Sequence, residues 1–162
     1  MRQVDRDCYR LAEIQAKLFE QSISQLHMGS EIFVRRFMNS EIAKELDSKA
    51  FLDGTETIFD IFDSLDDEYG KTTYGTVKYH RDVMYWCGYL YRCFCYHYEV
   101  SSKQAYRLFP LKYIASTYEV YHTLDVFQAI ERLLESKNIS LGGADFNKKG
   151  LEILRKMRLE KA

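Results

Sequence analysis

The chain of 162 residues is poor in proline, with Pro110 alone, and has almost none of the alternating β-branched pattern that is typical of strands. Apolar residues recur instead at helical spacing over nearly the whole length, without an internal repeat. The length suits one domain with a short appendage. These features predict an all-α fold: a compact multi-helix domain with a long central aromatic helix and a C-terminal amphipathic helix.

A strong excess of charge of one sign is also lacking. The formal net charge of -1 excludes a strong general attraction to nucleic acid or to an anionic membrane. The longest apolar stretch, residues 83–98, is too short for a membrane span and is interrupted by Arg92 and His97. The N-terminal residues contain no apolar signal core. We therefore expect a cytoplasmic protein with no membrane partner.

Cysteines and catalytic motifs do not indicate a reaction. No Cys-x-x-Cys pair occurs, so the four cysteines are expected to be buried thiols in a reducing compartment. Cys93 and His97 have i, i+4 spacing, but no second local pair of ligands supports a metal site. Gly-Lys-Thr at 70–72 lacks the earlier glycine of a phosphate-binding loop. We expect a non-enzymatic protein with no cofactor, no metal and no small-molecule substrate.

Tyrosine, by contrast, is concentrated in one third of the chain. Twelve of the thirteen tyrosines lie between Tyr69 and Tyr121, together with the sole tryptophan, Trp86. A buried tyrosine needs a hydrogen-bond partner for its hydroxyl, whereas aromatic residues are enriched at the centres of interfaces. This concentration indicates a surface that meets another molecule.

The aromatic helix, expected over residues 78–99, has two distinct faces at helical spacing. One face is expected in the core and contains Val83, Trp86, Cys87, Leu90, Phe94 and His97. The other face forms a stripe of Tyr85, Tyr89, Arg92 and Tyr96. Tyrosine and arginine are frequent binding hot spots, so this stripe is our candidate for the central partner contact. The alternative is a central helix surrounded by others, with its hydroxyls satisfied internally.

Arg92 and His97 also have an Arg-x4-His spacing, which resembles the catalytic signature of HEPN-type ribonucleases. In that chemistry the histidine acts as an acid or base and the arginine stabilises developing negative charge. The two side chains are about 140° apart on an ideal helix. The polar residue that usually follows the arginine is replaced by Cys93. A ribonuclease is therefore an alternative function.

Charged residues are segregated along the sequence. Residues 51–70 contain seven acids and no lysine or arginine, and Asp60, Asp63 and Asp67 are candidate contacts for a basic partner. A solvated helix face is the alternative interpretation. Residues 147–162 carry six cations and two acids on an amphipathic helix that follows the Gly-Gly pair at 142–143. We expect one helical domain over residues 1–140, and a hinge with a basic C-terminal helix over residues 141–162.

The remaining helices are expected over residues 4–27, from Ser30 onward in short pieces, and over 56–67, 101–109, 110–121 and 125–137. Residues 69–77 contain two glycines and three threonines and are expected to form a loop or a short β excursion.

Four segments resemble a group of small helical bacterial proteins associated with toxin–antitoxin and phage-defence loci. They are Tyr-Gly-Thr-Val-Lys-Tyr-His-Arg-Asp-Val-Met-Tyr-Trp-Cys-Gly-Tyr-Leu-Tyr-Arg from Tyr74 to Arg92, Ser-Ser-Lys from Ser101, and Tyr-His-Thr-Leu-Asp from Tyr121 followed by Gln-Ala-Ile-Glu-Arg from Gln128. The resemblance covers about residues 71–137 and leaves out the N-terminal third and the C-terminal helix.

The resemblance implies an antitoxin that neutralises a neighbouring toxin by binding it directly. It further implies that the toxin is a nucleotide-handling enzyme, such as an alarmone-synthetase-like or ADP-ribosyltransferase toxin. The expected partner is thus the cognate toxin, with operator DNA as a further possible partner of the C-terminal helix. The alternatives are the HEPN-like ribonuclease and a DNA-binding transcriptional regulator.

Overall fold

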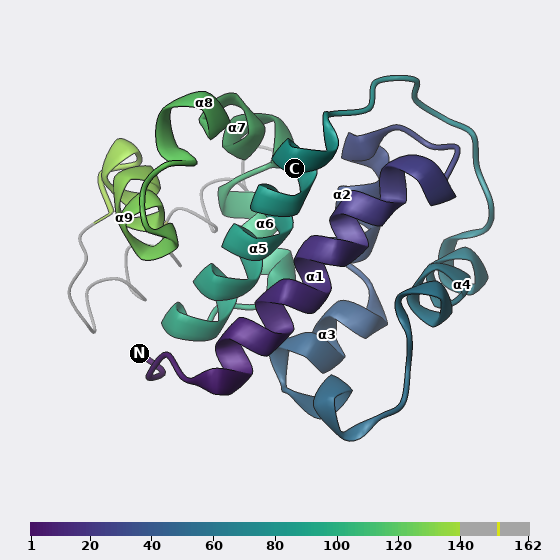
Figure 1. Cartoon of the computed structure of the whole chain (residues 1–162), viewed down its shortest axis with the longest axis horizontal. Coiled ribbons are helices and arrows are strands. Elements are labelled where there is room, and N and C mark those ends of the chain that lie inside the picture. The colour runs from purple at the N-terminus through teal and green to yellow at the C-terminus, as the bar shows by residue number, and fades with distance from the viewer. Residues whose placement is uncertain (140–151, 153–162) are drawn as a thin grey trace.

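Two long helices, α1 (Arg6–Gln25) and α5 (Arg81–Tyr98), lie side by side at the centre of the structure, which is a computed structural model (Figure 1). They run antiparallel. The Tyr96 hydroxyl donates to Asp5 before the start of α1, and Gln15 in the middle of α1 bonds to the Gly88 carbonyl. Beyond the other end of this pair, the Lys78 ammonium donates to the carbonyl of Ile23.

The structure describes residues 1–139 and Glu152, and every regular element within them is helical. The elements besides α1 and α5 are α2 (Ser30–Met38), α3 (Glu41–Asp47), the 3-10 turn η1 (Ala50–Asp53), α4 (Ile58–Tyr69), α6 (Ser102–Leu108), α7 (Leu111–Ser116), α8 (Tyr118–Tyr121) and α9 (Val126–Ser136). The expected all-α fold with a long central aromatic helix is confirmed for this part of the chain. The expected hinge and basic helix, residues 141–162, lie outside the described residues apart from Glu152.

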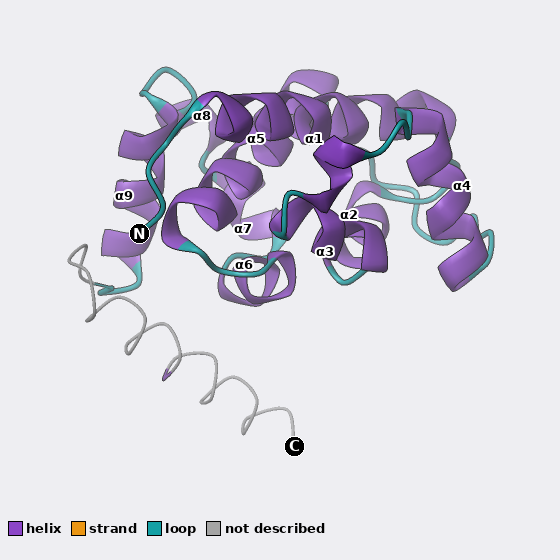
Figure 2. Ribbon diagram, turned by 90° about the horizontal axis from the view of Figure 1, so that it is seen from below, coloured by secondary structure: helices purple, strands orange, loops and turns teal. Residues whose placement is uncertain are grey.

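The helices form two layers, with α1 and α5 in one layer and α2, α3, α6 and α7 in the other (Figure 2). The core lies between them. Phe19 of α1 meets Phe33 and Phe37 of α2 edge to face, with both pairs of ring centroids 5.5 Å apart. Tyr91 of α5 joins this cluster at 6.3 Å from Phe19. Helix α4 lies at one end of the layers and α9 at the other (Figures 1 and 2).

Local sequence explains most of the helix boundaries. Thr57 and Asp60 form a reciprocal capping box, so α4 begins at Ile58. It ends at Tyr69, so both of its ends lie two residues later in the sequence than predicted. Ser101 and Gln104 cap α6 in the same way, as its sequence predicts. The helix expected over 110–121 is divided into α7 and α8 at Thr117, whose hydroxyl bonds back to the Ile114 carbonyl.

Residues 70–80 form a loop without regular structure, which ends three residues later than the predicted loop over 69–77. This loop is held against the turn between α1 and α2. The carbonyls of Tyr74 and Val77 accept hydrogen bonds from the backbone amides of Gly29 and Ser30, both at 3.0 Å. Gly75 has a positive φ of 82° and lies against Gly29, where a side chain on either residue would crowd the other backbone. The loop thereby fixes the start of α5 relative to α1.

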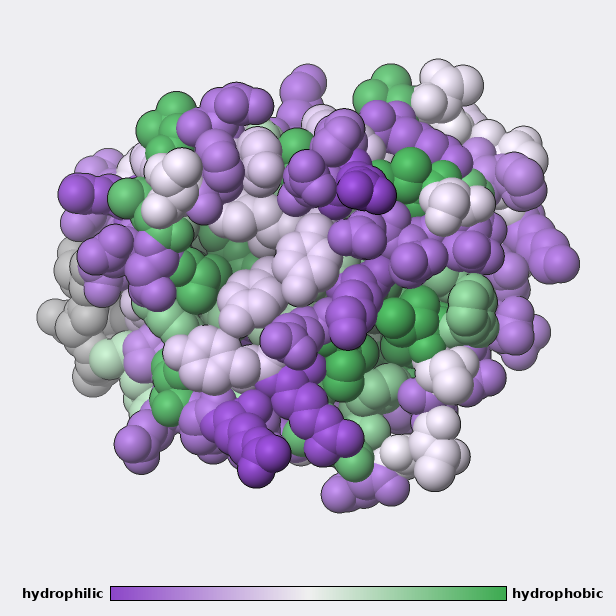
Figure 3. Space-filling model, viewed as in Figure 1, coloured by the Kyte–Doolittle hydropathy of each residue, from purple (hydrophilic) through white to green (hydrophobic). Residues whose placement is uncertain are grey.

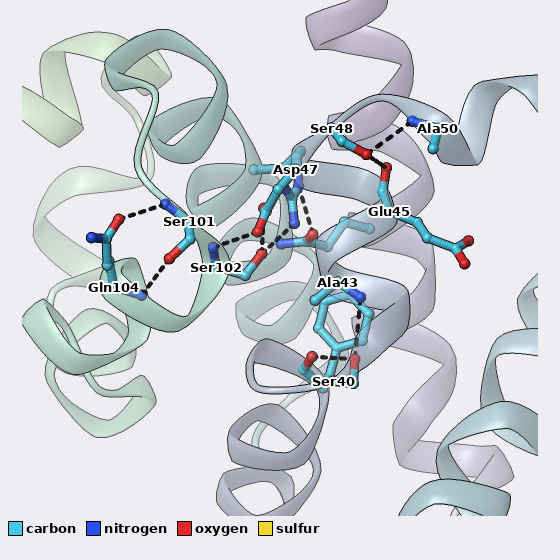
Figure 4. A network of polar contacts seen from close by, with 12 residues as sticks. Ser40, Ala43, Glu45, Asp47, Ser48, Ala50, Ser101, Ser102 and Gln104 are labelled. Carbon is cyan, nitrogen blue, oxygen red and sulfur yellow. Dashed lines mark hydrogen bonds and ion pairs between the residues drawn. The ribbon is translucent and has the colours of Figure 1, made fainter.

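A buried polar network joins the four helices α1, α3, α5 and α6. The Arg92 side chain is 1% exposed, and its Nε donates to Gln15 Oε1 of α1 at 2.8 Å. Its Nη1 pairs with Asp47 Oδ1 of α3 at 2.5 Å, and its Nη2 donates to Ser102 Oγ of α6 at 2.7 Å. Asp47 also accepts from the Ser102 backbone amide at 2.9 Å, as the close-up shows (Figure 4). Each guanidinium nitrogen thus has a hydrogen-bond partner inside the fold.

This network corrects the expectation that Arg92 and Tyr96 contact a partner. Tyr96 is 2% exposed, and its hydroxyl donates to Asp5 at 2.7 Å. The Arg2 guanidinium and the Lys49 ammonium lie over its ring, 4.7 Å and 5.0 Å from the centroid. Both predicted contact residues are buried because other elements cover this end of α5.

Candidate functional site

The outer end of α5 has an aromatic face that remains half-exposed. Asp82, Tyr85, Trp86 and Tyr89 follow i, i+3, i+4, i+7 spacing and therefore lie along one side of the helix. The sequence contains this spacing but predicts Trp86 on the core face of the helix. In the structure Trp86 is half-buried beside the two tyrosines.

A second wall comes from the segment around α8. Tyr118 begins α8, and His122 follows its last residue. Together with residues from α1, α5 and the start of α9 they enclose an open cavity of about 540 Å³. We call it the aromatic groove, and it is lined by Glu20, Asp82, Tyr85, Trp86, Tyr89, Tyr118, His122, Leu124 and Val126. Large side chains of intermediate hydropathy form a pale band over α1 and α5 on this face, beside hydrophobic residues (Figure 3).

The rings of the groove contact one another across elements. Tyr85 and Tyr89 stack at 6.5 Å between centroids, and Tyr118 stacks on His122 at 4.4 Å. Trp86 meets Tyr118 edge to face at 5.6 Å and so joins α5 to α8. The His122 Nδ1 lies 2.7 Å from the Tyr118 carbonyl oxygen, which fixes the imidazole against α8.

The hydroxyls of the groove differ from those of the internal tyrosines. Tyr91 donates to the Phe109 carbonyl, and Tyr96 donates to Asp5, so each buried hydroxyl has a partner within the chain. Among residues 1–139, no hydrogen-bond partner is found for the hydroxyls of Tyr85, Tyr89 or Tyr118. These three groups are available to donate to or accept from a bound molecule.

The groove carries negative charge at two edges. Glu20 of α1 is half-buried, and Asp82 of α5 is exposed. Partial burial raises the pKa of Tyr85, and the charges of Glu13 and Glu20 raise it further. Partial burial also raises the pKa of Tyr118, with Asp82 contributing. The carboxylates are therefore close enough to the rings to act on any charge placed between them.

The predicted contact residues are divided by the structure. Tyr85 and Tyr89 lie in the groove, whereas Arg92 and Tyr96, about one and two turns beyond Tyr89 on α5, are buried. Sequence reasoning missed Glu20, Trp86, Tyr118 and His122 as groove residues. His122, directly after α8, is exposed, whereas Tyr121 is half-buried.

The second predicted contact, on α4, has a more mixed role. The side chains of Asp63 and Asp67 are exposed. Asp60 is engaged in the cap: its carboxylate accepts from the Thr57 amide at 2.6 Å, and hydrogen bonds from Thr57 lower its pKa. Phe59 on the same helix is 60% exposed, so α4 presents acidic and apolar side chains together.

Arg92 and His97 do not form a common site in this conformation. Each of the three guanidinium nitrogens of Arg92 donates a hydrogen bond within the fold, to Gln15, Asp47 or Ser102. The His97 Nδ1 lies 2.9 Å from the Arg2 carbonyl oxygen, and its ring packs edge to face on Phe127. An Arg-x4-His ribonuclease mechanism would require the two side chains to reach one phosphate.

Metal and thiol chemistry have no organised site in the part of the chain that the structure describes. No group of three or more histidine, cysteine, aspartate or glutamate side chains is placed to hold a metal ion there. All four cysteines are free and buried. Burial raises the pKa of Cys95 to about 12, so its reactive thiolate is scarce at neutral pH.

The chemistry available in the groove is recognition by rings, hydroxyls and carboxylates. None of the helices within residues 1–139 is long and apolar enough to cross a membrane. Comparison of the chain with protein-family models, with curated proteins and with solved structures finds no match.

Proposed function

We propose that this chain is an antitoxin that neutralises a cognate bacterial toxin by direct protein–protein binding, with the aromatic groove at the centre of the contact. The single observation that carries this proposal is the groove itself. Trp86, Tyr85 and Tyr89 converge with Tyr118 in an open cavity, and the three tyrosine hydroxyls have no partner in the described fold. Aromatic side chains in a concave, partly desolvated pocket are typical binding hot spots.

The sequence resemblance over residues 71–137 supports the same function and includes most of the groove. It favours a nucleotide-handling toxin, such as an alarmone-synthetase-like or ADP-ribosyltransferase enzyme. The exposed carboxylates of Asp63 and Asp67 on α4 are proposed as a second contact that steers a basic surface toward this chain.

The test is expression of the open reading frame adjacent to the gene, with and without this chain, scored by growth and by co-purification. We expect the neighbour to arrest growth alone, and the intact chain to restore growth and form a stable complex. The variant Tyr85→Ala/Tyr89→Ala should lose both effects because it removes two rings from the groove while leaving the buried network intact.

Tyr74→Ala is the matched control, since Tyr74 is 73% exposed on the 70–80 loop and lies outside the groove. It should neutralise as well as the unmodified chain. Circular dichroism should show the same helical signal for all three proteins. If the chain alone arrests growth and His97→Ala removes the arrest, the antitoxin proposal is wrong and the ribonuclease alternative takes its place.

A further inference from the structure

The charge and shape of the groove identify the class of side chain that it recognises. Glu20 stands on α1 and Asp82 on α5, so the two carboxylates approach the rings from different helices. Within the described residues Glu20 has no hydrogen bond or ion pair. Asp82 has only exposed neighbours, with Arg81 Nε at 3.9 Å and His80 Nδ1 at 3.6 Å. Such exposed pairs are weak and leave carboxylate oxygens accessible.

Aromatic faces and carboxylates together favour a cation. A cation within about 6 Å of a ring centroid is attracted by the negative face of the ring, most strongly over tryptophan and tyrosine. The groove offers Trp86 together with Tyr85, Tyr89 and Tyr118. An acidic ligand would be repelled by Glu20 and Asp82, and a neutral ligand could form hydrogen bonds to them but would lack the charge attraction.

The planar arrangement of the rings selects among cations. Two stacked pairs, Tyr85 with Tyr89 and Tyr118 with His122, present flat surfaces from α5 and from α8. A guanidinium is flat, stacks on such rings and binds a carboxylate through two parallel N–H groups. Leu124 and Val126 supply apolar contact for the methylene stem of a long side chain.

We infer that the aromatic groove binds an arginine side chain that the toxin inserts between α5 and α8, with Glu20 or Asp82 as its carboxylate partner. This inference rests on the proposed function, because it names the chemistry of the partner at the same groove. An inserted arginine also suits a nucleotide-handling enzyme that uses arginine to bind phosphates, since its capture would remove that residue from the toxin's own site.

Trp86 makes a direct test possible, because it is the only tryptophan of the chain and lies in the groove. The full-length protein is titrated with the peptide acetyl-Gly-Arg-Gly-amide while Trp86 fluorescence is followed. We expect a saturable change with a Kd of roughly a millimolar, as ligand size allows. The citrulline peptide, which has the same shape without the charge, should bind at least tenfold more weakly.

The variant Glu20→Gln/Asp82→Asn should reduce arginine binding to the citrulline level and leave the helical signal unchanged. Its matched control is Glu45→Gln/Asp53→Asn, which removes the same charge from exposed positions on α3 and η1 and should bind like the unmodified protein. Equal binding of both peptides, or no loss in the groove variant, would overturn the inference.

Two further outcomes would assign another occupant and would also overturn it. Tighter binding of tetramethylammonium than of the arginine peptide would indicate a small quaternary ammonium ion. A tenfold gain in affinity on Arg155→Gln/Arg158→Gln would indicate that the chain's own C-terminal segment competes for the groove. If the peptide fails to bind but Tyr85→Ala/Tyr89→Ala still abolishes neutralisation, the antitoxin proposal stands and the arginine inference alone fails.

Discussion

At the scale of single residues, Arg92 and the groove tyrosines show how hydrogen-bond partners separate structure from recognition. Removing a guanidinium from water is costly unless its nitrogens find hydrogen-bond partners and its charge finds a counter-ion. Gln15, Asp47 and Ser102 provide that match, each from a different helix. A side chain that is satisfied in this way has nothing left to offer a partner. The hydroxyls of Tyr85 and Tyr89 still do.

The variant Asp47→Ala tests how much the buried network of Arg92 contributes to the free energy of unfolding. In Asp47→Ala the buried Arg92 would lose its counter-ion, and the Ser102 amide would lose its acceptor. Breaking one partner of a buried pair typically costs several kcal/mol, and we expect a loss of about 3 kcal/mol in the free energy of unfolding, measured by urea denaturation. Asp63→Ala, an exposed change on α4, should stay within about 0.5 kcal/mol of the unmodified protein. Equal midpoints for the two variants would show that the network contributes little.

At the scale of elements, the contact of α1 with α5 positions both the network and the groove. Gly88 lies where the helices approach most tightly: a Cβ there would be 2.8 Å from the Gln15 carbonyl oxygen and 2.9 Å from Phe19 Cγ. The same Gly88 carbonyl accepts from Gln15 Nε2 at 3.0 Å. The glycine therefore brings the two helices close enough for the hydrogen bond from Gln15 to Gly88, which a wider spacing would break.

Gly88→Ala should separate α1 from α5. Alanine gains about 1 kcal/mol in helix propensity, but overpacking against backbone atoms costs about 1–3 kcal/mol, and losing the Gln15 bond adds to that cost. We expect a net destabilisation of about 2 kcal/mol in urea and an altered Trp86 emission. Gly54→Ala is the control, since a Cβ at Gly54 would be 3.7 Å from its nearest neighbour, the Phe51 carbonyl oxygen. It should change stability by less than about 0.5 kcal/mol. A Gly88→Ala variant as stable as this control would contradict the close approach.

Elements with strong local signals could be predicted from the sequence. The period of apolar residues predicts α1 and α5, and Ser101 and Asp125 mark the starts of α6 and α9. The start of α4 lies two residues after its predicted start at residue 56, behind the Thr57 cap. Leu90 and Phe94 are in the core as their spacing predicts. What periodicity cannot provide is which neighbour covers each face, and this is why the stripe from Tyr85 to Tyr96 was interpreted as one surface.

The groove shows the same limit. Tyr85 and Tyr89 could be selected because they belong to one helix. Glu20 lies more than 60 residues before α5, and Tyr118 lies in a separate short helix after it. Only the packing of α1 and α8 against α5 brings them to the same cavity. The burial of Arg92 was equally hidden, because its three partners come from three other helices. Tertiary contacts overrode the surface expectation that a helical arginine normally carries.

At the scale of the whole molecule, the two proposed contacts lie on different parts of the structure. The aromatic groove is bounded by α1, α5 and α8, whereas the acidic helix α4 lies at the end opposite α9 (Figure 1). A partner that engages both would have to extend over α1. Because steering charges act at a distance while ring contacts act only on docking, changes on α4 are expected to affect association, and changes in the groove dissociation.

The folded chain also buries tyrosine hydroxyls and cysteine thiols that stay protonated in the core. Complete burial raises the pKa of Tyr91 well above its ordinary value of about 10, and burial raises the pKa of Cys95 to about 12. In the unfolded chain these two groups lose their protons near pH 9–10, whereas in the folded chain they keep them to a higher pH. Over the pH range between the two pKa values of each group, the native state therefore binds more protons than the unfolded state. Stability is therefore complete below about pH 8.5 and falls as pH rises.

We expect a loss of roughly 2–4 kcal/mol in the free energy of unfolding between pH 8 and pH 10.5, measured by urea denaturation at each pH. Tyrosinate absorbance at 295 nm should lag behind a simple titration at pH 10 and then rise together with the loss of helical signal, because Tyr91 ionises only when the layers separate. Glu20→Gln should lower the pKa of Tyr85 by removing a neighbouring negative charge, without moving the main transition. A smooth ionisation of all tyrosines near pH 10 in a chain that remains helical would show that the aromatic core admits water, and that the rings between the two layers are not held as closely as their contacts imply.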